Sequence, residues 1–205
     1  MTFATAIPRS TAALCTVVGI LTFGNACTEK RPSEPAADAQ LAAGISFSRH
    51  ASGEQPSAEV NQELAALRTA TARFHDIATA EANGWNVNFP PECLTHATMG
   101  GMGYHRMNPN LVDATVDPTE PELLVYEPEK NGSMRLVAVE YIIPFSVLPA
   151  TSTPPVLFGR AMGQNEVYQV WALHAWVWKD NPNGTFENFD PKVSCQYAGE
   201  VRTFE

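Results

Sequence analysis

The sequence has few charged residues, and the basic ones are in the minority. Charged side chains make up 17% of the 205 residues, and 13 Lys and Arg stand against 22 Asp and Glu, which gives a formal net charge of −9. Binding to nucleic acid or to anionic lipid through charge requires clustered Lys and Arg. The composition therefore argues against a nucleic-acid partner and against a basic membrane-binding patch.

The chain also lacks the short motifs of several common enzyme classes. It contains no Gly-x-Ser-x-Gly elbow, no phosphate-binding loop, no dinucleotide fingerprint, no His-Glu-x-x-His helix and no Cys-x-x-Cys-His haem attachment. The sequence therefore leaves open whether the protein is an enzyme. Its hydrophobic content of 44% is sufficient for a sizeable core, and its length suits one domain with extensions.

Residues 1–26 have the three-part pattern of a secretory signal peptide. Arg9 is the only charge, an apolar run follows over 12–23, and Gly24 and Ala26 supply small residues at the two positions that a signal peptidase must accommodate. The apolar run is too short to span a bilayer. We therefore predict export to the periplasm or cell envelope.

Cys27 directly follows the predicted cleavage point. The segment Phe-Gly-Asn-Ala-Cys resembles the lipobox of bacterial lipoproteins, although Gly24 stands where Leu is usual. The resemblance implies that Cys27 is acylated and anchors the protein to a membrane; the alternative is ordinary cleavage, which leaves a free thiol. An unpaired thiol is a liability in an oxidising compartment, which favours the lipid.

The composition divides the rest of the chain in two. Residues 28–57 are rich in Pro, Ser, Ala and charge and contain few large apolar residues, so burial cannot offset the entropy cost of ordering them. With Cys27 they form a predicted disordered tether, 27–57. The remainder, 58–205, is predicted to be a single α+β domain.

The domain begins with a helical pattern and continues with strands. Apolar residues recur at helical spacing after the N-cap Ser57 and predict a helix over 58–82. Short runs rich in Val, Ile, Tyr and Trp then predict strands at 123–126 and 135–143, joined by a turn at Asn131-Gly132, at 166–179, and a short pairing at 156–158 within the long loop 144–165. The predicted fold is one long amphipathic helix packed on a small, mostly antiparallel β-sheet with long loops.

Two cysteines remain after the signal peptide removes Cys15 and the lipid occupies Cys27. In an exported protein an even pair predicts a disulfide, here between Cys93 and Cys195. The alternative, two thiolates that join a metal site, needs a reduced state that this compartment disfavours.

Two histidines lie in one glycine-rich segment. His96 and His105 flank glycines at 100, 101 and 103, which allow close backbone approach or sharp turns. Their spacing matches no familiar zinc motif. A surface loop with incidental histidines is therefore the alternative to a binding site.

Two further polar residues lie within apolar strands. Alternation places His174 in a row with Trp176 and Trp178, and it places Glu140 on one face with Leu136, although which face of that strand is buried stays open. A buried carboxylate or imidazole needs a partner. For His174 taken alone, a backbone carbonyl in the core is the alternative partner.

A shared site for these residues is the leading hypothesis. His105, Glu140 and His174, with His96 as an addition, would bind a metal ion such as zinc or copper, or a small ligand. A metal-activated water would serve catalysis, if there is any. The alternative is a non-catalytic structural or interaction module with a disulfide-linked core and a hydrogen-bonded network in place of a metal.

Several segments resemble a family of uncharacterised exported bacterial proteins over about residues 60–195. The resemblance implies a single domain and transfers no activity. The segments are Met-Gly-Tyr-His at 102–105, Leu-Val-Tyr-Glu-Pro at 124–128, Val-Glu-Tyr at 139–141, Leu-His-Ala-Trp-Val-Trp-Lys-Asp-Asn-Pro at 173–182 and Asp-Pro-Lys-Val-Ser-Cys at 190–195.

Overall fold

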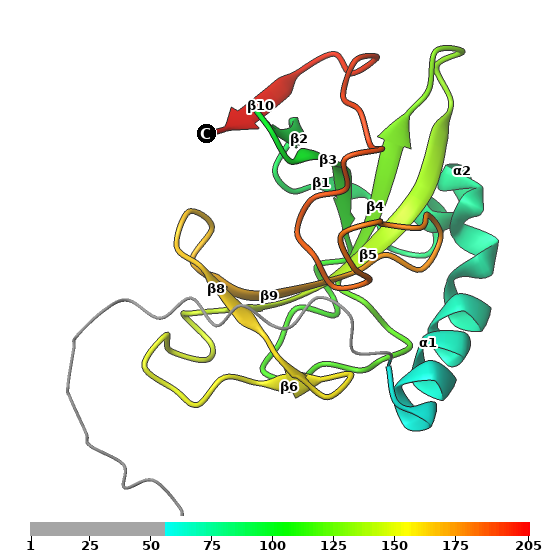
Figure 1. Ribbon diagram of the computed structural model, residues 1–205. Helices are drawn as coiled ribbons and strands as arrows, with labels where there is room; N and C mark the ends of the chain where they lie inside the picture. The colour runs from blue at the N-terminus through cyan, green and yellow to red at the C-terminus, as the bar shows by residue number, and fades with distance from the viewer. Residues whose placement is uncertain (1–55) are drawn as a thin grey trace, which may run out of the picture. The chain divides into compact units, whose positions relative to one another are not determined.

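The structure is a computed structural model, and it describes residues 56–205. The predicted signal peptide, the acylation site Cys27 and nearly all of the predicted tether lie outside these residues. The described part is α+β, with short helices beside a curled, mostly antiparallel sheet (Figure 1). None of the helices within residues 56–205 is long and apolar enough to cross a membrane.

The helical segment is interrupted, so the prediction of one long helix over 58–82 is wrong. The break is at Asp76, whose backbone is extended and whose side chain accepts a hydrogen bond from the Ala78 amide. Aspartate favours this arrangement because its carboxylate competes with helical hydrogen bonds and caps the next helix. The resulting pieces are α1 (Ala58–Thr71), the 3-10 turn η1 (Ala72–His75) and α2 (Ile77–Ala82).

The main sheet follows the strand order β10-β2-β3-β4-β5-β9-β8, and β1 pairs with β3 beside this path. Neighbouring strands are antiparallel except β10 and β2, which are parallel. The strands are β1 (Val87–Asn88), β2 (Cys93–His96), β3 (Gly100–Met107), β4 (Leu123–Pro128), β5 (Met134–Pro144), β6 (Val156–Leu157), β7 (Arg160–Ala161), β8 (Gly163–Asn165), β9 (Val170–Ala175) and β10 (Val201–Phe204).

Two predictions about local pairing are confirmed. β4 and β5 form a hairpin around Asn131 and Gly132, and Gly132 has the positive φ of 84° that this turn requires. β6 and β7 form the short pairing expected within 144–165.

The pairing of β4 with β5 contains a bulge. Val125 pairs with Ala138 and Tyr126 pairs with Leu136, so Val137 is an extra residue in β5. An extra residue reverses the alternation of side chains along the strand. Residues after Val137 therefore lie on the face opposite to the one that alternation counted from Leu136 predicts.

The bulge decides which side of the sheet carries Glu140. Simple alternation gives Glu140 the same face as Leu136. In the structure Leu136 instead shares a core with Tyr141 and with Leu64 of α1. Because Glu140 directly precedes Tyr141 in the strand, its side chain lies on the opposite face, away from the helices.

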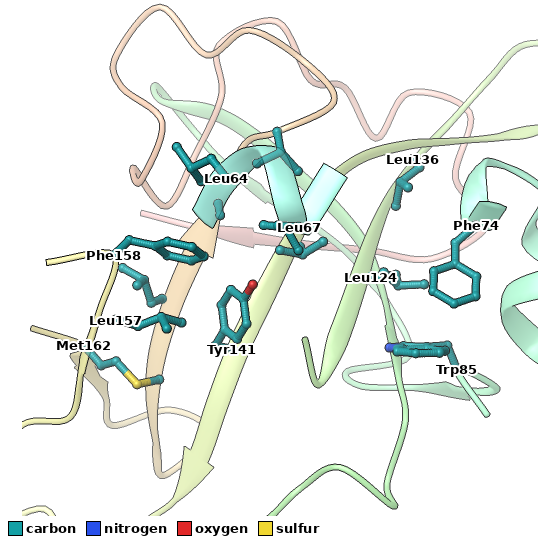
Figure 2. Packing of buried hydrophobic residues seen from close by; sticks show 14 of the residues in the cluster. Leu64, Leu67, Phe74, Trp85, Leu124, Leu136, Tyr141, Leu157, Phe158 and Met162 are labelled. Atoms are coloured by element: carbon teal, nitrogen blue, oxygen red, sulfur yellow. The ribbon is translucent and has the colours of Figure 1, made fainter. Parts of the chain in front are cut away.

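The main core fills the space between the helices and the sheet (Figure 2). The rings of Phe74 and Trp85 pack with centroids 4.5 Å apart, and the Tyr126 hydroxyl donates to the Phe74 carbonyl at 2.7 Å. The β6–β7 turn closes the core with Leu157 and Phe158. One face of the sheet thus carries the main core, and the opposite face carries two smaller apolar clusters beside its polar groups.

The strand predicted over 166–179 is limited to β9. Gln169, just before it, has a φ of 56°, which interrupts the extended backbone. After β9 the chain turns to the helix side, where Trp178 donates its indole N–H to Thr71 at 3.1 Å. The prediction that Trp178 lies in a row with His174 is therefore wrong.

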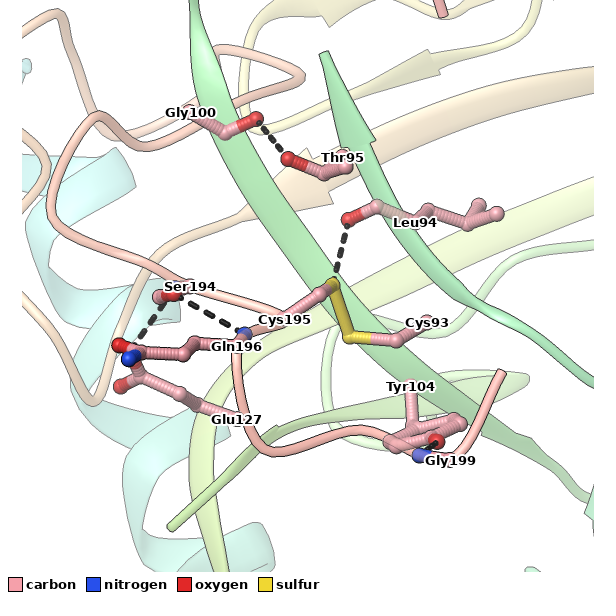
Figure 3. Close-up of a disulfide and its surroundings, with 10 residues drawn as sticks. All are labelled: Cys93, Leu94, Thr95, Gly100, Tyr104, Glu127, Ser194, Cys195, Gln196 and Gly199. Atoms are coloured by element: carbon pink, nitrogen blue, oxygen red, sulfur yellow. Dashed lines mark hydrogen bonds between the residues drawn. A yellow bond between two sulfur atoms is a disulfide. The ribbon is translucent and has the colours of Figure 1, made fainter. Parts of the chain in front are cut away.

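A disulfide between Cys93 and Cys195 links β2 to the C-terminal segment, as predicted (Figure 3). The two cysteines are 102 positions apart in the sequence. Beyond the disulfide, the Gly199 amide donates to the Tyr104 hydroxyl at 3.0 Å, and β10 then pairs in parallel with β2. The disulfide therefore adds a covalent link beside the sheet's parallel edge pairing.

The glycine-rich segment is strand β3 and not a surface loop. Gly100 and Gly103 have φ values of +94° and +112°, and a Cβ on them would lie 2.2 Å from the Asp190 carbonyl oxygen and 2.5 Å from the Tyr126 carbonyl oxygen. Close backbone approach therefore requires glycine at both positions, as the sequence suggested. The consequence for function is that His105 belongs to the sheet.

Candidate metal centre

Three strands bring His105, Glu140 and His174 to the face of the sheet that is turned away from the helices. Glu140 on β5 pairs directly with His174 on β9. His105 on β3 pairs with Val125 of β4, two positions from Leu123, which pairs with Glu140. His105 and Glu140 are thus two strands apart and meet over β4, which the curl of the sheet allows (Figure 1).

The side chains converge on one point. His105 Nε2 lies 3.3 Å from Glu140 Oε2 and 3.4 Å from His174 Nε2, and His174 Nε2 lies 3.8 Å from the same carboxylate oxygen. Within residues 56–205 this is the one group of three or more His, Cys, Asp and Glu side chains whose geometry suits a metal ion. The convergence predicted from the sequence is confirmed.

The cluster is buried. His105, Glu140 and His174 are 1%, 8% and 2% exposed. The Nδ1 atoms of both histidines have no hydrogen-bond partner in the described part of the chain. Buried polar groups without compensation cost free energy of folding, on the order of 1–3 kcal/mol each. A cation bound at the convergence point would compensate the burial of the Glu140 carboxylate and of the two Nε2 atoms, and it would leave the two Nδ1 atoms as they are.

Burial also decides the protonation of the metal-free cluster. It raises the pKa of Glu140 to about 8, with a further contribution from the Glu122 carboxylate. It lowers the pKa of His174 to about 4, and together with the nearby His174 it lowers the pKa of His105 to about 3. At neutral pH the metal-free site therefore consists of two neutral imidazoles and a protonated carboxyl, with no buried charge.

Two cavities meet at the cluster. One has a volume of about 220 Å³ and is lined by His105 and Glu140 among mainly apolar side chains. The other has about 310 Å³ and is lined by Glu140 and His174 together with polar residues of β8. The three side chains thus lie between two hollows through which a small molecule can approach.

His96, the fourth residue predicted for the site, lies apart from the cluster. It is on β2 and half-buried, its Nδ1 accepts a hydrogen bond from the Thr98 amide at 3.1 Å, and its ring packs edge-on against Phe189 at 5.2 Å. The structure therefore gives His96 a local partner and does not bring it to the other three residues.

Three methionines, whose soft sulfur would suit copper(I), lie near His96 and His105 in the sequence, and the structure separates them. Met102 lines both cavities, whereas Met99 is exposed and Met107 packs with apolar neighbours. The donor set around the convergence point is thus dominated by nitrogen and oxygen.

Sequence reasoning missed several residues around the site. Glu122 is 1% exposed and accepts a hydrogen bond from the Ile142 amide at 3.1 Å. Tyr168 and Asn188 line the 220 Å³ cavity. The signal for Glu122 was its position directly before the apolar run 123–126, but the lining residues come from loops, where no periodicity points to them.

The unfolding free energy of the metal-free protein is expected to fall as the pH rises from 6.5 to about 8. Folded-state pKa values of about 8 for Glu122 and Glu140, against 4.5 for the ordinary carboxyl, mean that the folded protein retains two protons that the unfolded chain has lost. The two histidines, with lowered pKa values, oppose this trend only below their ordinary pKa of 6.5.

Urea unfolding in the presence of a chelator, repeated over this pH range, measures the slope of the unfolding free energy against pH. The Glu140→Gln substitution is expected to reduce it by roughly half, because one of the two retained protons is removed. An unchanged slope would show that Glu140 is already ionised in the folded protein.

Comparisons of the chain with family models, with curated proteins and with solved structures give no match. The resemblance to a family of exported bacterial proteins therefore stays a prediction. Any statement about function rests on the site itself.

Proposed function

We propose that the protein binds a divalent metal ion through His105 Nε2, Glu140 Oε2 and His174 Nε2. The observation that carries the proposal is the convergence of these three atoms from three strands in a buried position. Two imidazoles and one carboxylate are the protein ligands of several catalytic zinc sites, which keep a fourth position open.

The ligand types favour zinc. Two imidazoles and one carboxylate are a common zinc donor set, whereas magnesium and calcium prefer oxygen ligands alone. The separations of the three ligand atoms, 3.3, 3.4 and 3.8 Å, are compatible with a tetrahedral site, for which zinc bonds give about 3.3 Å.

The open coordination position gives the ion a chemical role. A bound zinc ion lowers the pKa of a coordinated water and polarises carbonyl groups. Because His105 and Glu140 both line the 220 Å³ cavity, we place the open position on that side. Metal-assisted hydrolysis of a small molecule is the activity to assay, and ligand binding without turnover is the other form of the same proposal.

Metal analysis of the mature protein, produced without a histidine tag, tests the proposal. We expect about one zinc ion per chain, because the site has a single set of three ligands. A different ion at the same stoichiometry would correct the identity of the metal and retain the site. A protein that takes up no stoichiometric metal after exposure to zinc, copper(II) and iron(II) would leave the structural hydrogen-bond network as the function of the cluster.

We further propose that the domain acts at a membrane surface of the cell envelope, anchored through an acylated Cys27. The supporting observations are the signal-like segment 1–26, the lipobox-like residues before Cys27 and the disulfide, which suits an oxidising compartment.

The Cys27→Ser substitution is expected to move the protein from the detergent phase to the aqueous phase in a detergent partition experiment. The reason is that a serine at this position cannot carry the thioether-linked lipid. Mass spectrometry of the N-terminal peptide of the unsubstituted protein is the control. Aqueous partition of both forms would show that the signal is cleaved without lipidation.

A further inference from the structure

The 220 Å³ cavity has a chemistry that the metal ligands do not explain. Ten of its fourteen lining residues are apolar or aromatic, and among the described residues that line it there is no Lys or Arg. Arg202 lies against the rings of Tyr168 and Phe204 but is not one of the lining residues, so a multiply charged anion such as a phosphate ester would have no positive side chain in direct contact. The walls favour a ligand whose body is apolar.

The volume limits the size of that ligand. A dry apolar cavity of about 150 Å³ accommodates benzene. The cavity here is larger, at about 220 Å³. It therefore has room for one ring and a short substituent.

Two pairs of aromatic side chains form its walls. Phe89 packs on Tyr168 with ring centroids 5.8 Å apart, and Phe189 packs on Phe204 at 6.1 Å. The Arg202 guanidinium lies 5.5 Å from the ring centroids of both Tyr168 and Phe204 and so connects the two pairs. The planes within each pair meet at 58° and 61°, so the walls present ring faces and ring edges, and both pack well against an aromatic guest.

One wall also presents an unused polar group. The Tyr168 hydroxyl is buried and has no hydrogen-bond partner within residues 56–205. Buried hydroxyls are normally paired, so a ligand oxygen is a suitable acceptor for this donor. The proposed metal ion, held by His105 and Glu140 in the lining of the same cavity, is a second group that attracts a ligand oxygen, besides the Tyr168 hydroxyl.

We infer that the cavity binds a small aromatic carbonyl compound, with its ring against the aromatic walls and its oxygen directed to the Tyr168 hydroxyl and the metal ligands. The contact with a metal ion rests on the proposed function. The ring and the Tyr168 hydrogen bond do not, since they depend on the cavity alone.

Two pairs of probes separate these parts. The affinities of benzamide and acetamide, measured by ligand-observed NMR on the metal-free mature protein, test binding to the cavity without a metal ion. Benzohydroxamate and acetohydroxamate, measured by calorimetry on the zinc-loaded protein, share a metal-binding head group and differ in the ring. In each pair we expect the aromatic member to bind at least tenfold more tightly.

Two substitutions identify the contacts. Phe204→Ala removes part of one wall near the chain end and is expected to reduce the preference for the aromatic hydroxamate to about threefold or less without a change in metal content. Tyr168→Phe keeps the ring and is expected to weaken benzamide about three- to tenfold. Tyr197→Phe, at a tyrosine that is 48% exposed, is the matched control and is expected to change nothing.

The outcomes are distinguishable. Absence of metal together with benzamide binding that depends on Phe204 and Tyr168 overturns the proposed metal site and retains the cavity. Stoichiometric metal with no preference for the aromatic member of either pair overturns the inference and retains the metal site. Binding that is indifferent to both substitutions places the ligand elsewhere and also overturns it.

Discussion

The His174→Ala substitution is expected to reduce the bound zinc from about one ion per chain to a level near zero. Loss of a residue that only supports a metal ligand weakens affinity by about 10- to 100-fold, so loss of a ligand is expected to weaken it further. His105→Ala is expected to have the same effect. Metal content after dialysis against a weak chelator measures the loss.

Glu140→Gln is the sharpest variant in this series. At neutral pH the glutamine amide is close in shape and charge to the protonated carboxyl that the raised pKa of Glu140 implies. The metal-free variant should therefore fold as the unsubstituted protein does, while its neutral amide binds zinc poorly. A metal site predicts loss of metal with little loss of metal-free stability.

Histidine controls complete the test. His75 is exposed and packs edge-on against Trp178 at 4.3 Å, so His75→Ala should keep the metal. His96→Ala should keep it as well, because His96 lies outside the cluster. Metal loss in either control, or metal retention in His174→Ala, contradicts the assignment of ligands.

Replacement of both Cys93 and Cys195 by alanine is expected to be the most destabilising of the substitutions proposed here. The disulfide spans 102 positions, and for a loop of about 100 residues the chain-entropy estimate is about 4–5 kcal/mol, usually an upper bound. Both sulfur atoms belong to buried residues, so packing losses add to this. Urea unfolding of the variant against the oxidised protein gives the difference.

The reduced protein with both cysteines present is the control for packing. It should lose most of the same stability, because it lacks the crosslink and keeps both side chains. Mass spectrometry of an unreduced digest must show the Cys93–Cys195 peptide pair in the starting material. A double variant whose unfolding free energy lies within about 1 kcal/mol of that of the oxidised protein would show that the crosslink contributes little to stability.

The sequence was informative wherever a local rule applied. The Asn131-Gly132 turn, the Cys93–Cys195 pair and the N-cap Ser57 each follow from residue types with a strong local preference, and the structure has all three. The helix break was missed because the apolar spacing continues through Asp76. Periodicity reports a buried face and does not detect one polar residue that caps a new helix.

The site was predicted for a partly incorrect reason. Glu140 and His174 were singled out as polar residues in apolar strands, and that argument was sound. The face of Glu140 depends on a bulge at Val137, which no local motif in this sequence marks. Likewise the sequence left open whether His105 lies in a loop, because glycines that allow backbones to approach closely are indistinguishable in sequence from glycines that turn the chain.

The bulge at Val137 has a consequence for how this chain tolerates insertions and deletions. Val137 is the one position in β5 whose removal leaves the register intact, because Leu136 and Ala138 would then be consecutive and keep their partners Tyr126 and Val125. Glu140 would stay opposite Leu123 and keep facing its histidines. Loss of one residue between Ala138 and Glu140 would instead turn the carboxylate to the helix side, even though every site residue would still be encoded. Among related sequences, a β5 shorter by one residue would therefore keep the site only if the missing residue is the one in the bulge.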